Sequence, residues 1–428
     1  MALFSCAQRT SAGLFLSRLL VFAFSLCVTL WPVVAEEGYE VLVKRTEEIR
    51  GLKFKTPIVF ERLNEASLDA FLESELSRQY TPQEWQSLRD SLAMLGAFSR
   101  DVDLQGLFRD LLNEQAGGLY DPHTGKMYVI GSLSLKTGLA GMILVHELTH
   151  ALTDQHFHLL ALPIEDSSND DKAQAALSVV EGDATIAMIL YGKDLGIGGL
   201  LGTGLAGLLV DQDTFASSPA LIQSSLMLPY LAGENFLREI MRTGRIENGS
   251  LVPRQAPGPL TDRPDWEVVN YLYKNPPLST EQVLHPEKYL GQRDDPVEVK
   301  IDSKKFLEAF GPDWELAREN TLGEGMIQAL LIDPLSPLEA RDIAAGWDGD
   351  RYALFRSREG ASALCWRTVW DTGEDAAQFR KAMEDLTRKK VFNGVPVLLP
   401  GEKSAHNEVG LWIVSDSRLI ELVSRGTE

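Results

Sequence analysis

The segment His146-Glu-Leu-Thr-His150 combines metal-binding and acid–base side chains at a spacing that suits one helix. At about 100° per residue, His146 and His150 lie about 40° apart on one helix face, where their imidazoles can bind one zinc ion. Glu147 is offset by about 100°, which places its carboxylate where it can hold and deprotonate a metal-bound water. The spacing predicts a zinc site with Glu147 as its general base.

The residues around this motif are apolar, which indicates a buried helix. Residues 142–145 precede the motif, and Leu148, Ala151 and Leu152 continue the apolar pattern. Two imidazoles and a carboxylate in a core carry a large desolvation cost unless they have a partner, and a metal ion supplies one. A hydrogen-bonded core helix and a zinc site that has lost catalysis stay open as alternatives.

A second apolar helix is expected to supply a third ligand. In the string AQAALSVVEGDATIAMILYG, the charged residues are Glu181 and Asp183. Because burying an unpaired carboxylate is costly, coordination of the ion accounts for Glu181; a structural Glu bonded to His or Arg is the alternative. Gly182 would let this helix approach the first one closely. Asp183 is expected behind the ligands or facing solvent.

His156 competes with Glu181, because it lies ten residues after the first histidine of the motif, as in the pattern H-E-x-x-H-x-x-G-x-x-H. That pattern needs Gly where this chain has Thr153. In a continuous helix, His156 points about 120° away from His150 and off the metal face. Glu181 is therefore preferred. Asp154 is expected to orient a ligand imidazole or to cap the site.

A β-hairpin is predicted directly before the metal helix. Residues 119–120 and 127–130 have strand character, and residues 121–125 have the composition of a turn. An edge strand beside the metal could hold a substrate backbone by β-augmentation. An ordinary hairpin that covers the helix is the alternative.

The rest of the chain is predicted to be mainly helical before about residue 296 and mixed beyond it. Residues 36–115 carry apolar residues three and four apart, and one helix begins at the cap Thr81 followed by Pro82. Beyond residue 296, NTLGEGMIQALLI, SPLEARDIAAGW and EDAAQFRKAMEDLTRKK favour helices. RYALFRS, SALCWRTVWDT, GLWIVSDS and RLIELVSR favour strands. These patterns predict an α+β region with an antiparallel sheet.

The first 35 residues are predicted to be a signal peptide. Two arginines precede the apolar run 19–30, and Ala35 suits cleavage; an uncleaved membrane anchor is the alternative. The mature chain would be exported to the periplasm or outside the cell. It would keep a single cysteine, Cys365, so any zinc must be held by His and carboxylate side chains.

The overall charge and two further features bear on partners. A formal net charge of -20 without a Lys/Arg cluster argues against nucleic acid as a partner. The uncharged, Gly-rich stretch 195–210 favours an apolar loop or a tightly packed helix, and a lid or a membrane-surface contact stays open. For His285, a capping or packing role is preferred. The alternative is that His285 donates a hydrogen bond in the transition state.

At HELTH and VVEGDA, the chain resembles the gluzincin group of zinc metallopeptidases. The longer strings HELTHALTDQHF, VEGDA and STEQVLHPEKY are similar to a set of exported bacterial and archaeal proteins with this core. The resemblance implies that His146, His150 and Glu181 bind one Zn²⁺ ion and that Glu147 is the base. Thr185 stands where the group has Asp, and no G-x-M-E-N stretch is present.

These observations predict a fold and two functional hypotheses. The expected fold is α+β: a signal peptide (1–35), a mainly helical zincin-like metallopeptidase domain with a β-hairpin (36–295), and a C-terminal α+β domain (296–428). The first hypothesis is an exported zinc-dependent peptidase, an endopeptidase, acting on peptides or proteins. The second is a non-catalytic or latent zincin scaffold that serves as a binding or assembly module of the cell envelope.

Overall fold

The structure is a computed structural model of the 428-residue chain. It describes residues 39–115, 118–130, 138–196, 213–259, 263–332, 334–389, 392–398 and 407–427. The predicted signal peptide lies outside the described residues. So does most of the Gly-rich stretch 195–210, of which only Leu195 and Gly196 are described.

The described elements have these bounds. The helices are α2 (Tyr39–Arg50), α3 (Glu65–Gln79), α4 (Pro82–Met94), α5 (Leu104–Gln115), α6 (Gly138–Phe157), α7 (Asp170–Asp194), α9 (Asp213–Ser217), α10 (Ala220–Thr243), α11 (Trp266–Lys274), α12 (Thr280–Leu284), α13 (Pro286–Tyr289), α14 (Ser303–Phe310), α15 (Gly323–Ile332), α16 (Pro337–Ala344), α17 (Gly373–Arg388) and α18 (Ile420–Thr427). The strands are β1 (Val59–Leu63), β2 (Gly118–Asp121), β3 (Lys126–Ile130), β4 (Gly244–Glu247), β5 (Ser250–Pro253), β6 (Trp314–Asn320), β7 (Trp347–Ser357), β8 (Ser362–Trp370), β9 (Val395–Leu398) and β10 (Glu408–Val414). Short 3-10 helices are η1 (Leu159–Ala161), η2 (Pro163–Glu165) and η4 (Ser417–Leu419).

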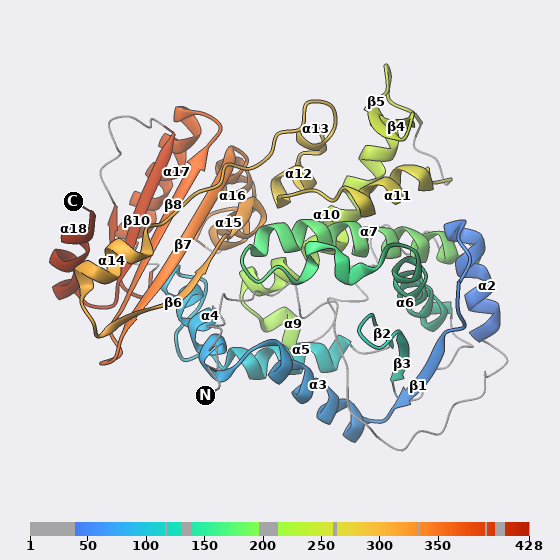
Figure 1. Cartoon of the computed structure of the whole chain (residues 1–428), viewed down its shortest axis with the longest axis horizontal. Helices are drawn as coiled ribbons and strands as arrows, with labels where there is room; N and C mark the ends of the chain where they lie inside the picture. The colour runs from blue at the N-terminus through green and yellow to red at the C-terminus, as the bar shows by residue number, and fades with distance from the viewer. Residues whose placement is uncertain are drawn as a thin grey trace, which may run out of the picture.

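The predicted hairpin and the predicted C-terminal sheet are both present. β1, β3 and β2 form a small sheet in that order, with β1 parallel and β2 antiparallel to β3. β2 therefore lies at an edge of this sheet. β6, β7, β8, β10 and β9 form an antiparallel sheet in that order. In Figure 1, α7 and α10 run between this larger sheet and the group formed by α6, α2 and the small sheet.

Local sequence signals explain where α4 begins. Thr81 caps α4 as predicted, since its side chain accepts the Glu84 N–H while Glu84 accepts the Thr81 N–H. Pro82 occupies the first turn of α4, where a missing N–H leaves no helical bond unmade.

The strand prediction at RLIELVSR is wrong. Residues 417–419 form η4 and Ile420–Thr427 form α18. Asp416 accepts the backbone N–H of Arg418 at 2.9 Å and so begins η4. Val423 is buried in a cluster with aromatic side chains of α14 and β10. Packing of Val423 in this cluster therefore stabilises a helix where the composition of the segment favoured a strand.

The largest hydrophobic cluster joins helices of the N-terminal half to the C-terminal sheet. It contains the buried side chains of Trp85 in α4, Met326 in α15 and Trp366 in β8. The predicted boundary between 36–295 and 296–428 thus crosses a shared core, and the division into domains stays a prediction.

The start of α7 is fixed by residues from the C-terminal half. Arg318 Nη2 donates to Asp170 Oδ2 at 3.2 Å, and both side chains are buried. Asp171 Oδ1 accepts the backbone N–H of Thr280 at 2.9 Å and also its hydroxyl. Gly323, with φ +78°, packs so closely on Asp171 that a Cβ would lie 1.8 Å from Asp171 Oδ1. α7 is therefore held by α12, α15 and β6.

By length and composition, α7 is long and apolar enough to cross a membrane, and it meets this test alone among the described helices. However, 89% of its apolar window is buried inside the protein. The core position of α7 accounts for its apolar composition.

We predict that the folding stability of the Asp171→Asn variant falls less with rising pH than the folding stability of the wild type. Burial raises the pKa of Asp171 to about 8, although the Thr280 hydrogen bonds oppose the shift. The unfolded chain releases this proton near the usual Asp value, so the stability that the carboxyl supplies is lost as the pH rises from about 4 to about 8. Asn keeps an oxygen for Thr280 and has no proton to lose.

Melting temperatures at pH 5 to 8 test this expectation. The Tm of the variant minus that of the wild type should increase with pH by at least about 2 °C over this range. A constant difference between the two proteins would show that Asp171 is already ionised in the folded state at pH 5, as it is in the unfolded chain.

Candidate metal centre

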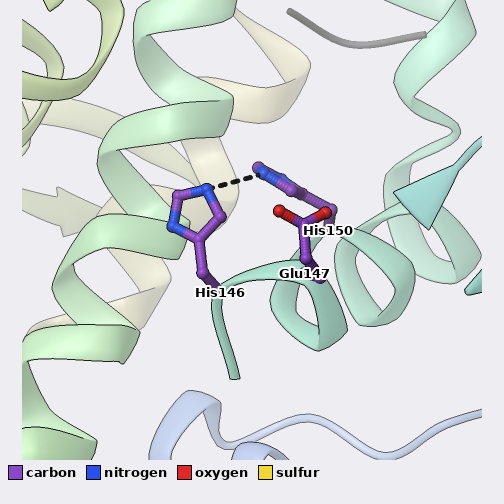
Figure 2. Close-up of side chains that lie close together, drawn as sticks. All are labelled: His146, Glu147 and His150. Carbon is purple, nitrogen blue, oxygen red and sulfur yellow. Dashed lines mark hydrogen bonds between the residues drawn. The ribbon is translucent and has the colours of Figure 1, made fainter. Parts of the chain in front are cut away.

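Three potential metal ligands lie close together on α6 (Figure 2). His146, Glu147 and His150 each offer one atom, and these atoms lie within 4.8 Å of one another. Both histidines are buried and Glu147 is half-buried. His146 Nε2 and His150 Nε2 are 3.1 Å apart. This group could bind a metal ion.

Glu181 reaches the same point from α7. Its Oε2 lies 3.0 Å from His146 Nε2 and 3.4 Å from His150 Nε2. Ligands at about 2.0–2.2 Å from a shared tetrahedral ion lie about 3.4 Å apart. The three atoms therefore have nearly the mutual spacing of ligands around one ion.

The buried Glu181 carboxylate controls the electrostatics here. Burial alone would lower the pKa of His150, but the charge of Glu181 raises it above the usual value for His. Burial alone would raise the pKa of Glu181, but His150 and His146 lower it below the usual carboxylate range. Within the described part of the chain, the buried Nδ1 atoms of both histidines have no hydrogen-bond partner. The Nε2 atoms of both histidines are thus the ring nitrogens that approach the Glu181 carboxylate.

Glu147 is bound to the edge strand. Its Oε2 accepts the backbone N–H of Tyr120 in β2 at 2.8 Å. Burial raises the pKa of Glu147, although the neighbouring histidines and this N–H oppose the shift. A carboxyl group with a raised pKa is suited to accepting and returning a proton near neutral pH.

Asp154 does not orient a ligand imidazole through any contact among the described residues. Its Oδ2 accepts the hydroxyl of Tyr120 at 2.7 Å, and its Oδ1 accepts the backbone N–H of Leu159 at 2.8 Å. It thus links the C-terminal end of α6 to β2 and η1, and the part of the expectation that concerned the imidazole is wrong.

Tyr230 in α10 is a site residue that the sequence did not single out. Its ring stacks on His146 with 5.7 Å between ring centroids. Its hydroxyl lies near the Glu181 carboxylate, and burial together with the nearby carboxylates raises the pKa of Tyr230 well above the usual value for Tyr. A lone tyrosine in an apolar helix gives no spacing signal, so only the packing of α10 against α7 reveals it.

Three other candidates are bound elsewhere. His156 Nε2 lies 2.8 Å from the backbone oxygen of Lys53, and His285 Nε2 lies 2.9 Å from Glu324 Oε1. Asp183 is fully buried and accepts Arg50 Nε at 2.9 Å. The expectation that Asp183 could face solvent is therefore wrong, since it forms a buried ion pair between α7 and α2.

The close approach expected at Gly182 occurs against a different helix. A Cβ on Gly182 would lie 2.5 Å from the backbone of Gly233 in α10, and a Cβ on Gly233 would lie 2.1 Å from Ser178 O. The expected partner was the metal-binding helix, so this prediction is wrong in its partner. The contact brings Tyr230 next to Glu181, since each lies within three residues of one of these glycines.

A small pocket of about 30 Å³, which can hold about one water molecule, lies beside these groups. Its polar lining comes from Tyr120, Glu147, His150, Glu181 and Tyr230. Its apolar lining comes from Leu119, Pro122, Leu159 and Val180. The metal-binding atoms of His150 and Glu181 therefore border a space that a water molecule can occupy.

Comparison with known proteins reaches only the C-terminal part of the chain. A family model described as a domain of unknown function (DUF8575) matches residues 314–425. This range begins at β6 and excludes the candidate metal centre. No curated protein and no solved structure gave a match.

We predict that Gly233→Ala destabilises the protein by about 1–3 kcal/mol, the usual range for overpacking. The added Cβ would meet the backbone oxygen of Ser178, which cannot move without shifting α7. Gly258→Ala is the matched control, because its Cβ would lie at an ordinary 3.5 Å from Arg242 O. Thermal unfolding should give a lower Tm for Gly233→Ala and an unchanged Tm for Gly258→Ala. Equal Tm values for all three proteins would contradict the close packing.

Proposed function

We propose that the protein is an exported zinc-dependent peptidase of gluzincin type, in which His146, His150 and Glu181 bind one Zn²⁺ ion. The supporting observation is that two imidazole nitrogens and one carboxylate oxygen lie 3.0–3.4 Å from one another. Two His and one carboxylate are a donor set of catalytic zinc sites, which keep a fourth position for water or substrate. Glu147 lies beside these ligands, is not needed as a fourth one, and lines the pocket.

Zinc would supply Lewis-acid polarisation of the substrate carbonyl and of the attacking water. Glu147 would accept a proton from that water and pass it to the leaving nitrogen, so that water and an amide become a carboxylic acid and an amine. The Tyr230 hydroxyl, whose raised pKa keeps it protonated, would donate a hydrogen bond to the substrate oxygen as negative charge develops there.

The edge strand supports a peptide or protein as the substrate in this proposal. β2 is paired with β3 on one side, and its Tyr120 N–H points to the metal side, where it meets Glu147. An extended peptide can add to such an edge through main-chain hydrogen bonds. A peptide or protein bound along β2 would place a backbone carbonyl near the ligand atoms, as an endopeptidase requires.

We expect Glu147→Gln to retain zinc and to lose peptide hydrolysis by about 10²-fold to 10⁴-fold, the range for removal of an acid–base group. Gln keeps an oxygen that can accept the Tyr120 N–H, so the change removes the proton transfer rather than the strand contact. Cleavage of a peptide library by the zinc-loaded protein and its variant measures this. Cleavage by both proteins would exclude Glu147 as the base. Cleavage by neither would favour the non-catalytic scaffold, a binding or assembly module of the cell envelope.

We expect Glu181→Ala to lower zinc affinity by more than about 100-fold, the upper range for residues that only support a ligand. His156→Ala is the control, since His156 contacts Lys53 O and lies outside the ligand cluster. Competition with a chelator gives both affinities without reference to activity. A larger loss for His156→Ala than for Glu181→Ala would reverse the assignment of the third ligand.

A further inference from the structure

Tyr120 in the edge strand is held at both ends by one helix. Its backbone N–H donates to Glu147 Oε2 at 2.8 Å, and its hydroxyl donates to Asp154 Oδ2 at 2.7 Å. Glu147 and Asp154 are seven residues apart on α6, so they lie about 20° from each other on one helix face. The tyrosine is 4% exposed and spans the distance between these two carboxylates.

Asp154 also binds η1, a second element that lines the pocket. While Oδ2 accepts the Tyr120 hydroxyl, Oδ1 accepts the backbone N–H of Leu159 at 2.8 Å. Tyr120 and Leu159 line the pocket from β2 and η1, and Glu147 and His150 line it from α6. A single carboxylate outside the candidate ligand set thus ties three pocket-forming elements together.

We propose that Asp154 and Tyr120 are positioning residues: Asp154, acting through the Tyr120 hydroxyl, sets the register of β2 against Glu147. β2 has four residues and one neighbouring strand, so its own ladder constrains sliding along α6 weakly. The side-chain bond to Asp154 stands two helical turns from the Glu147 contact and opposes such sliding. The position of Glu147 relative to the strand that would bind a substrate backbone therefore stays fixed.

The structural part of this inference is independent of activity, and its kinetic part rests on the proposed peptidase function. A displacement of about 1 Å at a reacting centre can lower a rate about 100-fold. Loss of the Tyr120 hydroxyl should therefore lower kcat more than it raises KM. Zinc affinity should stay unchanged, because His146, His150 and Glu181 keep their contacts.

Hydrogen exchange of the backbone amides of residues 118–121 tests the link in the full chain. In Tyr120→Phe and in Asp154→Ala, exchange at the Tyr120 amide should be at least about tenfold faster, since a hydrogen bond to a charged acceptor stabilises by that factor or more. Tyr128→Phe is the matched control: it removes a buried hydroxyl from the other strand of the hairpin, which faces Thr124 and Glu61. Its Tyr120 amide should exchange as in the wild type.

A double variant separates positioning from general loosening. If Asp154 acts on β2 through Tyr120, then adding Tyr120→Phe to Asp154→Ala should produce no further acceleration of exchange at the Tyr120 amide. Unchanged exchange in Tyr120→Phe, equal acceleration in Tyr128→Phe, or additive effects in the double variant would each overturn the proposal. These results stand even if the wild-type protein cleaves no peptide, whereas failure of the peptidase proposal would appear only in the cleavage assay.

Discussion

The buried carboxylate of Glu181 lies 3.0 Å from His146 Nε2 and 3.4 Å from His150 Nε2, although it belongs to a different helix from both. A carboxylate removed from water needs charged or hydrogen-bonding partners, so α7 can occupy its place only if α6 presents its histidines there. The same contact assembles the candidate metal ligands. Much of the remaining structure can be understood as what holds α7 in that position.

α7 is constrained at three points along its length. Its first residues are bound by Arg318 and Thr280, its middle packs through Gly182 on α10, and Asp183 pairs with the fully buried Arg50 of α2. Removing one partner of such a buried pair typically costs about 3–5 kcal/mol, because the other charge stays in the core. The position of Glu181 therefore depends on residues from both ends of the chain.

The C-terminal sheet takes part in this arrangement. The DUF8575 match covers residues 314–425, yet Arg318 in that range binds Asp170, and Trp366 shares a core with Trp85 of α4. The candidate ligands lie outside the matched range. The matched region is thus part of the support of the candidate site without supplying a residue that lines it.

The sequence by itself determined those secondary-structure elements whose formation depends on residues close together in the chain. The helix with His146, Glu147 and His150, the hairpin before it, the cap at Thr81 and most of the C-terminal elements follow from periodicity and turn composition, because these act over a few residues. The placement of Glu181 was also expected, since a lone carboxylate in an apolar helix requires a partner.

Tertiary structure decided which distant groups meet. The sequence offered no sign that Tyr230 would stack on His146, that Gly182 would meet α10 rather than α6, or that Asp154 would bind Tyr120. The composition of RLIELVSR favours a strand, but residues 420–427 form α18. Burial of Val423 against α14 and β10 outweighs that composition. These pairings depend on how whole helices pack together, and packing is set by the shapes of surfaces that no short stretch of sequence encodes.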